Sequence, residues 1–125
     1  MTNRRMFLKS ATAVCATVFA GPVLAGGHGR LGTFTGKSRH ETTGGVEIAG
    51  RTVTLLDDFT FDGAPDPKVA LGKNGFRKQW ILAPLASNAG KQSYEIPADI
   101  DVDSVNEVWI WCEKFNVPLG VAKIN

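Results

Sequence analysis

The sequence lacks any apolar run of the roughly 18 residues that a membrane-spanning helix requires. It also lacks an excess of either charge, because 14 Lys and Arg against 12 Asp and Glu give a formal net charge of +2. That balance does not indicate a nucleic-acid or membrane-surface partner. The 125 residues are too few for a multidomain enzyme, and a 43% hydrophobic content argues against global disorder. We therefore expect one compact domain.

The first 25 residues have the composition of an export signal. A basic start, Arg-Arg-Met-Phe-Leu-Lys at residues 4–9, precedes a mildly apolar stretch at residues 11–20 and a helix-breaking Gly21-Pro22. A signal peptidase accepts small residues at the last positions before its cleavage site, and this predicts cleavage after Ala25. The start resembles the twin-arginine signal, with Asn3 where Ser or Thr is usual. We predict a twin-arginine-type signal peptide over residues 1–25, a single domain over residues 26–125, and a periplasmic or secreted protein without a membrane span.

After this cleavage the domain is short of sulfur and imidazole groups. Its 100 residues contain no methionine, one cysteine (Cys112) and two histidines (His28 and His40). Loss of Arg4, Arg5 and Lys9 leaves 11 basic and 12 acidic residues, a formal charge of −1. One thiol excludes an internal disulfide and a covalent c-type haem, and it is too few for the usual structural zinc sites. A blue-copper site is excluded because neither His nor Met follows Cys112.

The remaining pattern is that of short strands separated by turns, with no long helical periodicity. We predict a hairpin formed by residues 46–48 and 52–56 and a proline-bearing loop at residues 62–67. We also predict a loose linker at Gly26–Arg30 and a solvated acidic face that includes Glu107. The predicted strands cover residues 46–48, 52–56, 69–71, 79–85, 92–96, 105–113 and 115–124. Pro84 places the end of the strand at residues 79–85 at a sheet edge. This organisation predicts an all-β fold, a small antiparallel sandwich or barrel-like sandwich.

The segment from Val105 to Glu113 is the strongest strand. Its faces alternate between Val108, Ile110 and Cys112 on one side and Trp109 and Trp111 on the other. Because both faces are apolar, we expect a central strand that is covered on both sides.

Cys112 is the main candidate for chemistry. A lone thiol in an exported protein is open to oxidation unless it is buried or liganded. It can act as a redox thiol, as a haem or metal ligand, or as a small buried core residue, and the residues alone leave these alternatives open. His40 is a candidate for a second ligand or a proton donor; the alternative is a histidine in a surface turn with no such role. Trp109 and Trp111 are candidates for core aromatics; the alternative is that they line a flat cofactor. No metal site or catalytic constellation is recognisable.

The chain resembles the DM-thirteen domain over residues 30–124, in the Val108–Cys112 strand and the Gly63–Asp66 loop. Further matching positions are His40, Gly44 or Gly45, Val46, Ile48, Asp58, Phe59, Leu71, Gly90, Tyr94, Pro97, Phe115, Val117, Gly120 and Ala122. One departure is Ala64, inserted where the family more often has Gly directly before Pro-Asp.

The resemblance implies a small extracellular β domain described as an electron-transfer module, in which Cys112 is the family's characteristic cysteine. We therefore predict an exported redox or electron-transfer module that uses Cys112 as a redox thiol or haem ligand and meets a redox partner protein. Whether any cofactor is bound stays open. The alternative is a non-catalytic binding module in which Cys112 is a core residue. The two differ in whether Cys112 is dispensable.

Overall fold

A computed structural model describes residues 29–125, and this part of the chain forms strands and one short 3₁₀ helix, Val102–Ser104, with no α-helix. The strands are β1 (Arg30–Gly36), β2 (Thr42–Thr43), β3 (Gly45–Ala49), β4 (Thr52–Leu55), β5 (Thr60–Phe61), β6 (Pro67–Gly72), β7 (Phe76–Pro84), β8 (Gln92–Glu95), β9 (Glu107–Cys112) and β10 (Val117–Lys123). The predicted all-β fold is confirmed. The predicted signal peptide lies outside the described residues.

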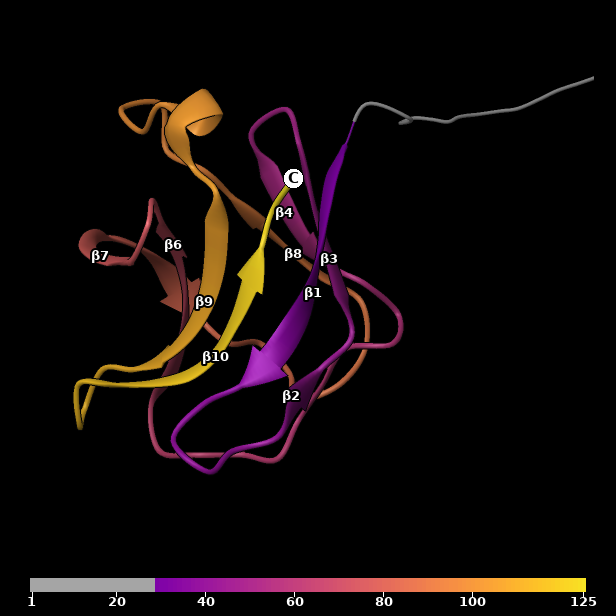
Figure 1. The fold of residues 1–125 in the computed structure, drawn as a ribbon, viewed down its shortest axis with the longest axis vertical. Helices are drawn as coiled ribbons and strands as arrows, with labels where there is room; N and C mark the ends of the chain where they lie inside the picture. Colours follow the sequence, from indigo (N-terminus) through magenta and orange to yellow (C-terminus); the bar gives the residue numbers. More distant parts are fainter. Residues whose placement is uncertain (1–28) are drawn as a thin grey trace, which may run out of the picture.

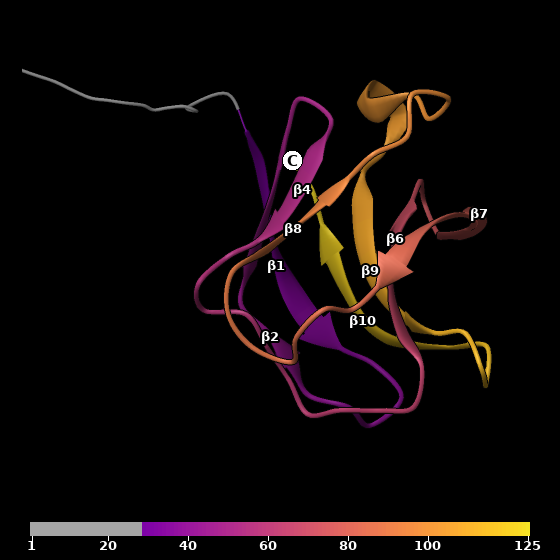
Figure 2. The ribbon, with the colours of Figure 1, turned by 180° about the vertical axis from the view of Figure 1, so that it is seen from behind.

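Eight antiparallel strands form one strongly curved sheet in the order β7-β6-β9-β10-β1-β3-β4-β8. The two edge strands, β7 and β8, come into contact, so the sheet is a nearly closed barrel (Figures 1 and 2). Just beyond the β7 edge, the Ala86 N–H donates to the Tyr94 hydroxyl of β8 at 2.8 Å. The short pair β2-β5 lies across one end of the barrel, the lower end in Figure 1.

The interior is filled by alternate side chains of the strands, as period-2 patterning requires. Buried core residues come from every part of the sheet and from the turn before β5. They include Phe34, Val46, Ile48, Val53, Leu55, Phe59, Val69, Leu71, Val108, Ile110, Cys112 and Leu119. The rings of Phe34 and Phe59 meet edge to face at 5.5 Å between centroids. A continuous apolar interior of this kind supports the barrel without a disulfide.

Most predicted strands are confirmed with small shifts at their ends. The predicted hairpin is the β3–β4 pair, in which Val46 lies opposite Leu55. Pro84 does end an edge strand, β7. The last strand begins at Val117, two residues later than predicted, because residues 113–116 form the β9–β10 turn with Asn116 at φ 56°. Phe115 lies in this turn and is 59% exposed.

The linker prediction is wrong at its end, because Arg30 begins β1, a strand the sequence pattern did not predict. β1 lies inside the sheet, between β10 and β3. The Arg30 guanidinium donates to the carbonyls of Val102 and Val105 at 2.8 and 2.9 Å. Arg30 is therefore a structural anchor for the segment before β9.

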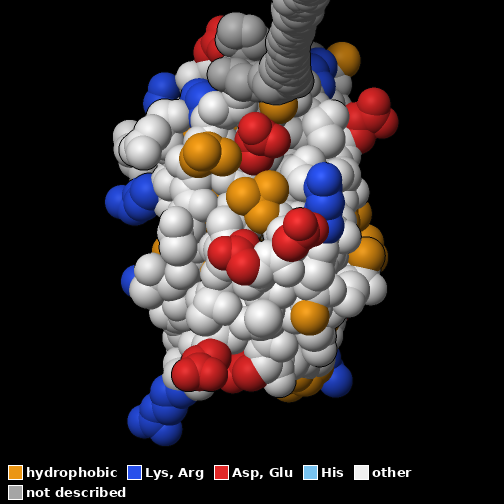
Figure 3. Space-filling view, turned by 90° about the vertical axis from the view of Figure 1, so that its right-hand side faces the viewer, with side chains coloured by type: hydrophobic (Ala, Val, Ile, Leu, Met, Phe, Trp, Pro, Cys, Tyr) orange, Lys and Arg blue, Asp and Glu red, His pale blue; other side chains and the backbone are white. Residues whose placement is uncertain are grey.

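The face that carries β3, β4 and β8 is mixed in character. In the part of Figure 3 that shows described residues, hydrophobic side chains form separate spots among charged and polar atoms.

Within residues 29–125, no helix has the length and apolar character to cross a membrane.

Candidate functional site

Cys112 is the last residue of β9 and faces the barrel interior. Its side chain belongs to the core, and the residue is only 1% exposed. It lies opposite Pro67 of β6 and Val117 of β10. It is the only cysteine among the described residues, so no disulfide forms within this part of the chain.

The polar partner of this thiol is a backbone carbonyl. The Cys112 Sγ donates to the Pro65 carbonyl oxygen at 3.1 Å. Pro65 belongs to the connection between β5 and β6, which runs along the lower end of the barrel in Figure 1. Because a carbonyl only accepts, this hydrogen bond requires the thiol to keep its proton. Cys112 is therefore the donor in the one polar contact of its sulfur.

His40 and Asp62 fix the first end of this connection. Asp62 accepts from the His40 ring Nδ1 at 2.9 Å and from the Glu41 N–H at 3.0 Å. The Glu41 backbone hydrogen bond, followed by the His40 hydrogen bond, lowers the pKa of Asp62 from its ordinary value of 3.8. The carboxylate can only accept, so Nδ1 carries a proton, and the ring lies beside Phe61 at 5.7 Å between centroids. His40 is thus the donor and Asp62 the acceptor in this contact.

Lys68 fixes the second end. Its ammonium group pairs with Asp66 at 3.0 Å and with Glu113, which follows Cys112 directly. The hydrogen bond to Glu113, followed by that to Asp66, raises the pKa of Lys68 above 10.5. The Glu113 N–H also donates to the Asp66 carbonyl at 3.3 Å. These contacts join the end of the connection to the end of β9.

Residues 62–66, here called the thiol loop, therefore carry the Cys112 contact between two anchors. His40 and Cys112 contact opposite ends of this loop, and no hydrogen bond among the described residues joins them to each other. The sequence pattern predicts only a loop in this segment and indicates no role for Asp62. The feature of the sequence that could have drawn attention to this loop was the Gly63–Asp66 motif, which is part of the family resemblance.

The two tryptophans of β9 lie on the outer face of the sheet, opposite Cys112. Phe76 of β7 stacks on Trp111 with centroids 3.6 Å apart and an interplanar angle of 4°, and Trp109 meets Trp111 edge to face at 5.9 Å. These half-buried rings form a small outer cluster, so the expectation that they are core aromatics is wrong. A flat group lying against them would be separated from the Cys112 sulfur by the thickness of the sheet.

Glu107 supports this outer cluster from one end of β9. It is 4% exposed, and its Oε1 accepts from the Gly75 N–H at 2.7 Å and from the Trp109 Nε1–H at 3.1 Å. Gly72 leaves room for these atoms, since a Cβ there would lie 2.6 Å from the indole nitrogen. The prediction of a solvated Glu107 is wrong, because the carboxylate is buried, with its Oε1 hydrogen-bonded and its Oε2 3.8 Å from the Lys123 ammonium group.

The surroundings of Cys112 do not fit a haem ligand. A haem iron needs an open position beside the sulfur, whereas this sulfur is packed in the core and covered by the Pro65 carbonyl. Three surface hollows of about 430–460 Å³ are lined by other residues. Among the described residues, no group of three or more His, Cys, Asp and Glu side chains is placed to hold a metal ion.

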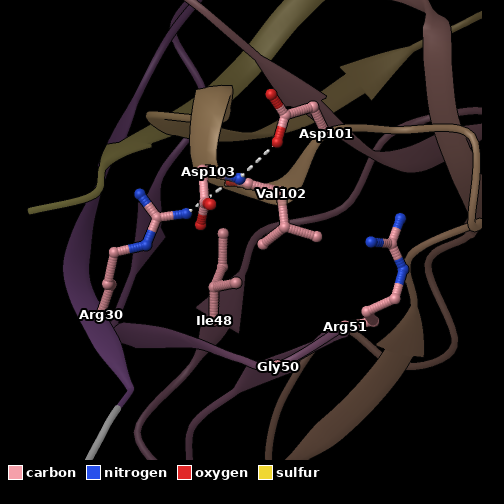
Figure 4. Close-up of a pocket in the computed structure, with 7 residues that line it drawn as sticks. All are labelled: Arg30, Ile48, Gly50, Arg51, Asp101, Val102 and Asp103. Atoms are coloured by element: carbon pink, nitrogen blue, oxygen red, sulfur yellow. Dashed lines mark hydrogen bonds between the residues drawn. The ribbon is translucent and has the colours of Figure 1, made fainter.

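One of these hollows lies between Arg30 and Arg51, over a floor of Ile48 and Val102 (Figure 4). The Arg51 guanidinium donates to the carbonyls of Ile96, Pro97 and Ile100. Both arginines therefore bind the backbone of the segment between β8 and β9, and the hollow is the gap between two structural anchors.

A comparison with known families gives one match. A family model described as Electron transfer DM13 matches residues 33–124, which include Cys112, His40 and the whole thiol loop. No curated protein and no solved structure matches the chain.

Proposed function

This chain belongs to the electron transfer DM13 family, and from that membership we propose that it is an exported electron-transfer module whose redox group is the Cys112 thiol. The observation that carries the proposal is the position of Cys112: it is the one thiol of the described domain, and it lies under a loop that touches it through a single polar contact. The export signal and the periplasmic location are part of the same proposal.

The chemistry that suits a single thiol is exchange with a disulfide of a partner protein. Cys112 loses its proton, and the thiolate attacks one sulfur of the partner disulfide. The partner S–S bond breaks as the new S–S bond to Cys112 forms, and the released partner thiolate takes up a proton. The Cys112 sulfur is thereby oxidised and the leaving sulfur is reduced. Attack by that partner thiol on the mixed disulfide reverses the step.

An equilibrium with glutathione tests this function. The purified protein is incubated with reduced and oxidised glutathione at a series of ratios, and the glutathione adduct is measured by intact mass. We expect one adduct that forms and disappears reversibly as the ratio changes, and none in C112S. The measurement uses the exported protein that begins at Gly26, because cleavage removes Cys15 and leaves Cys112 as the one thiol. A folded protein that forms no adduct at any ratio would contradict the proposal.

A second candidate function is favoured by the burial of Cys112. A 1% exposed thiol inside an apolar core is also what a packing residue looks like. In that case the domain is a non-catalytic binding module. C112A would then keep every partner interaction of the wild-type protein, whereas the redox proposal requires that exchange with the partner be lost.

A further inference from the structure

The thiol of Cys112 cannot take part in exchange while the thiol loop lies over it. Attack on a partner disulfide needs the sulfur, and here the sulfur is buried and donates to the Pro65 carbonyl. Either the whole barrel must open or the loop must move. The loop is short, and it is closed by identifiable contacts at its two ends.

The anchor at Asp62 is the easier one to release. It consists of contacts with the β1–β2 connection: the His40 ring and the Glu41 N–H donate to one carboxylate that is 41% exposed, and the Asp62 N–H donates to the Glu41 carbonyl at 3.1 Å. The anchor at Asp66 is different, because Lys68 joins it to Glu113 and the Glu113 N–H binds the Asp66 carbonyl. That second anchor is continuous with β6 and β9, whereas Asp62 is tied to a turn. Gly63, at φ 99°, follows directly and offers a point where the backbone can change direction.

We propose that Asp62 is a positioning residue for Cys112: through His40 and Glu41 it holds the Pro65 carbonyl over the thiol, and release of Asp62 uncovers the sulfur for its partner. That opening serves thiol exchange rests on the proposed function. That Asp62 holds the loop closed follows from the contacts of the loop alone. Opening at Asp62 breaks the Cys112–Pro65 hydrogen bond and exposes the sulfur, while the core strands stay paired.

The test measures how fast a small aromatic disulfide reagent reacts with Cys112 in the folded protein. D62N replaces the charged acceptor with a weaker one, and we expect the reaction to become faster by about tenfold, as for loss of a charge-assisted contact that closes a local segment. The matched control is D58N. Asp58 also accepts a backbone N–H, from Gly45 at 2.9 Å, but it lies in another turn. D58N should react at the wild-type rate. H40A, which leaves the Glu41 contact, should fall between the wild type and D62N.

A pH series tests whether the charge of Asp62 holds the loop closed, and a comparison with urea unfolding separates positioning from a general loss of stability. The groups that face the Asp62 carboxylate are His40 and the Glu41 N–H, and Lys68 pairs only with the far anchor. The wild-type loop should therefore open as the pH falls through the titration of Asp62, so the ratio of D62N to wild-type rates should fall towards one below about pH 4. Equal rates for D62N and D58N at pH 7 would overturn the proposal. So would a rate that rises only in proportion to the unfolded fraction measured in urea. Fast labelling of D62N without a reversible glutathione adduct would contradict the proposed function and leave this inference standing.

Discussion

Phe76 lies flat against Trp111, although the two residues belong to an edge strand and a central strand of the sheet. Their ring centroids are 3.6 Å apart and their planes differ by 4°. The contact holds the start of β7 against the outer face of β9. It gives this side of the barrel an apolar layer outside the core.

F76A should test this layer. We expect a loss of about 1–3 kcal/mol in the free energy of unfolding, less than for a fully buried phenylalanine, because the ring is half-buried. Tryptophan fluorescence of the folded protein should shift to longer wavelength as Trp111 gains contact with water. F115A, at the 59% exposed tip of the β9–β10 turn, is the control and should change neither quantity.

Glu107 should tolerate removal of its charge better than removal of its acceptors. E107Q keeps an oxygen for the Gly75 N–H and the Trp109 indole, so we expect a loss below about 1 kcal/mol. E107L leaves both donors without a partner and should cost about 2–3 kcal/mol. Urea unfolding of the two variants measures the difference. Equal stabilities would show that these hydrogen bonds contribute little.

The lowered pKa of Asp62 predicts an acid-dependent contribution to stability. A carboxylate whose pKa is lower in the folded protein stabilises it above the ordinary value of 3.8 and loses this effect as the pH falls through the folded pKa. The urea midpoints of the wild type and D62N should therefore differ between pH 5 and 8 and converge below about pH 4. A difference that persists unchanged at pH 2 would contradict this prediction.

Arg51 should control the motion of the segment between β8 and β9. In R51A the carbonyls of Ile96, Pro97 and Ile100 lose the hydrogen bonds from the Arg51 guanidinium. Amide hydrogen exchange should become faster in residues 98–105 and stay unchanged in β9 and β10. R77A is the control, since Arg77 contacts the Trp80 ring and not this segment. R51K should behave more like R51A, because lysine cannot reproduce the planar fork of donors.

The proposed export route makes a separate prediction. Replacing Arg4 and Arg5 together by Lys keeps the charge but removes the paired arginines, and we expect the protein to stay in the cytoplasm. The exported wild-type protein should begin at Gly26, which N-terminal sequencing or intact mass can show. R39K, outside the signal, is the control. Unchanged export of the double variant would exclude the twin-arginine route.

The part of the fold that could be predicted is the part encoded by local alternation. β9 was predictable because apolar residues fill both of its faces, and β3 and β4 because a glycine turn separates two alternating runs. β1 was not, because Phe34 is its one buried residue, its other large apolar residue, Leu31, is exposed, and its remaining positions are polar or glycine. That strand is held by backbone pairing with β10 and β3, which no local pattern records.

The sequence predicted Cys112 as the residue of the candidate site, but it did not predict which residues surround it. Cys112 followed from the shortage of other thiols. Its partner did not, because the contact with Pro65 spans 47 positions in the chain and that between His40 and Asp62 spans 22. The anchoring roles of Asp62 and Lys68 arise only when the barrel brings these segments to one end. Glu107 was misread for a similar reason, because its burial depends on a glycine and an indole supplied by the fold.

The order of the strands also determines when this protein can finish folding. β1, the first strand, pairs with β10, the last, so the seam between them closes a loop that spans nearly the whole domain. Such a long closure is slow, because a contact between segments far apart in the chain must overcome the entropy of closing the loop between them. The barrel is thus completed only when β1 and β10 are both in place. A folding intermediate that lacks this seam leaves the edges of both strands unpaired.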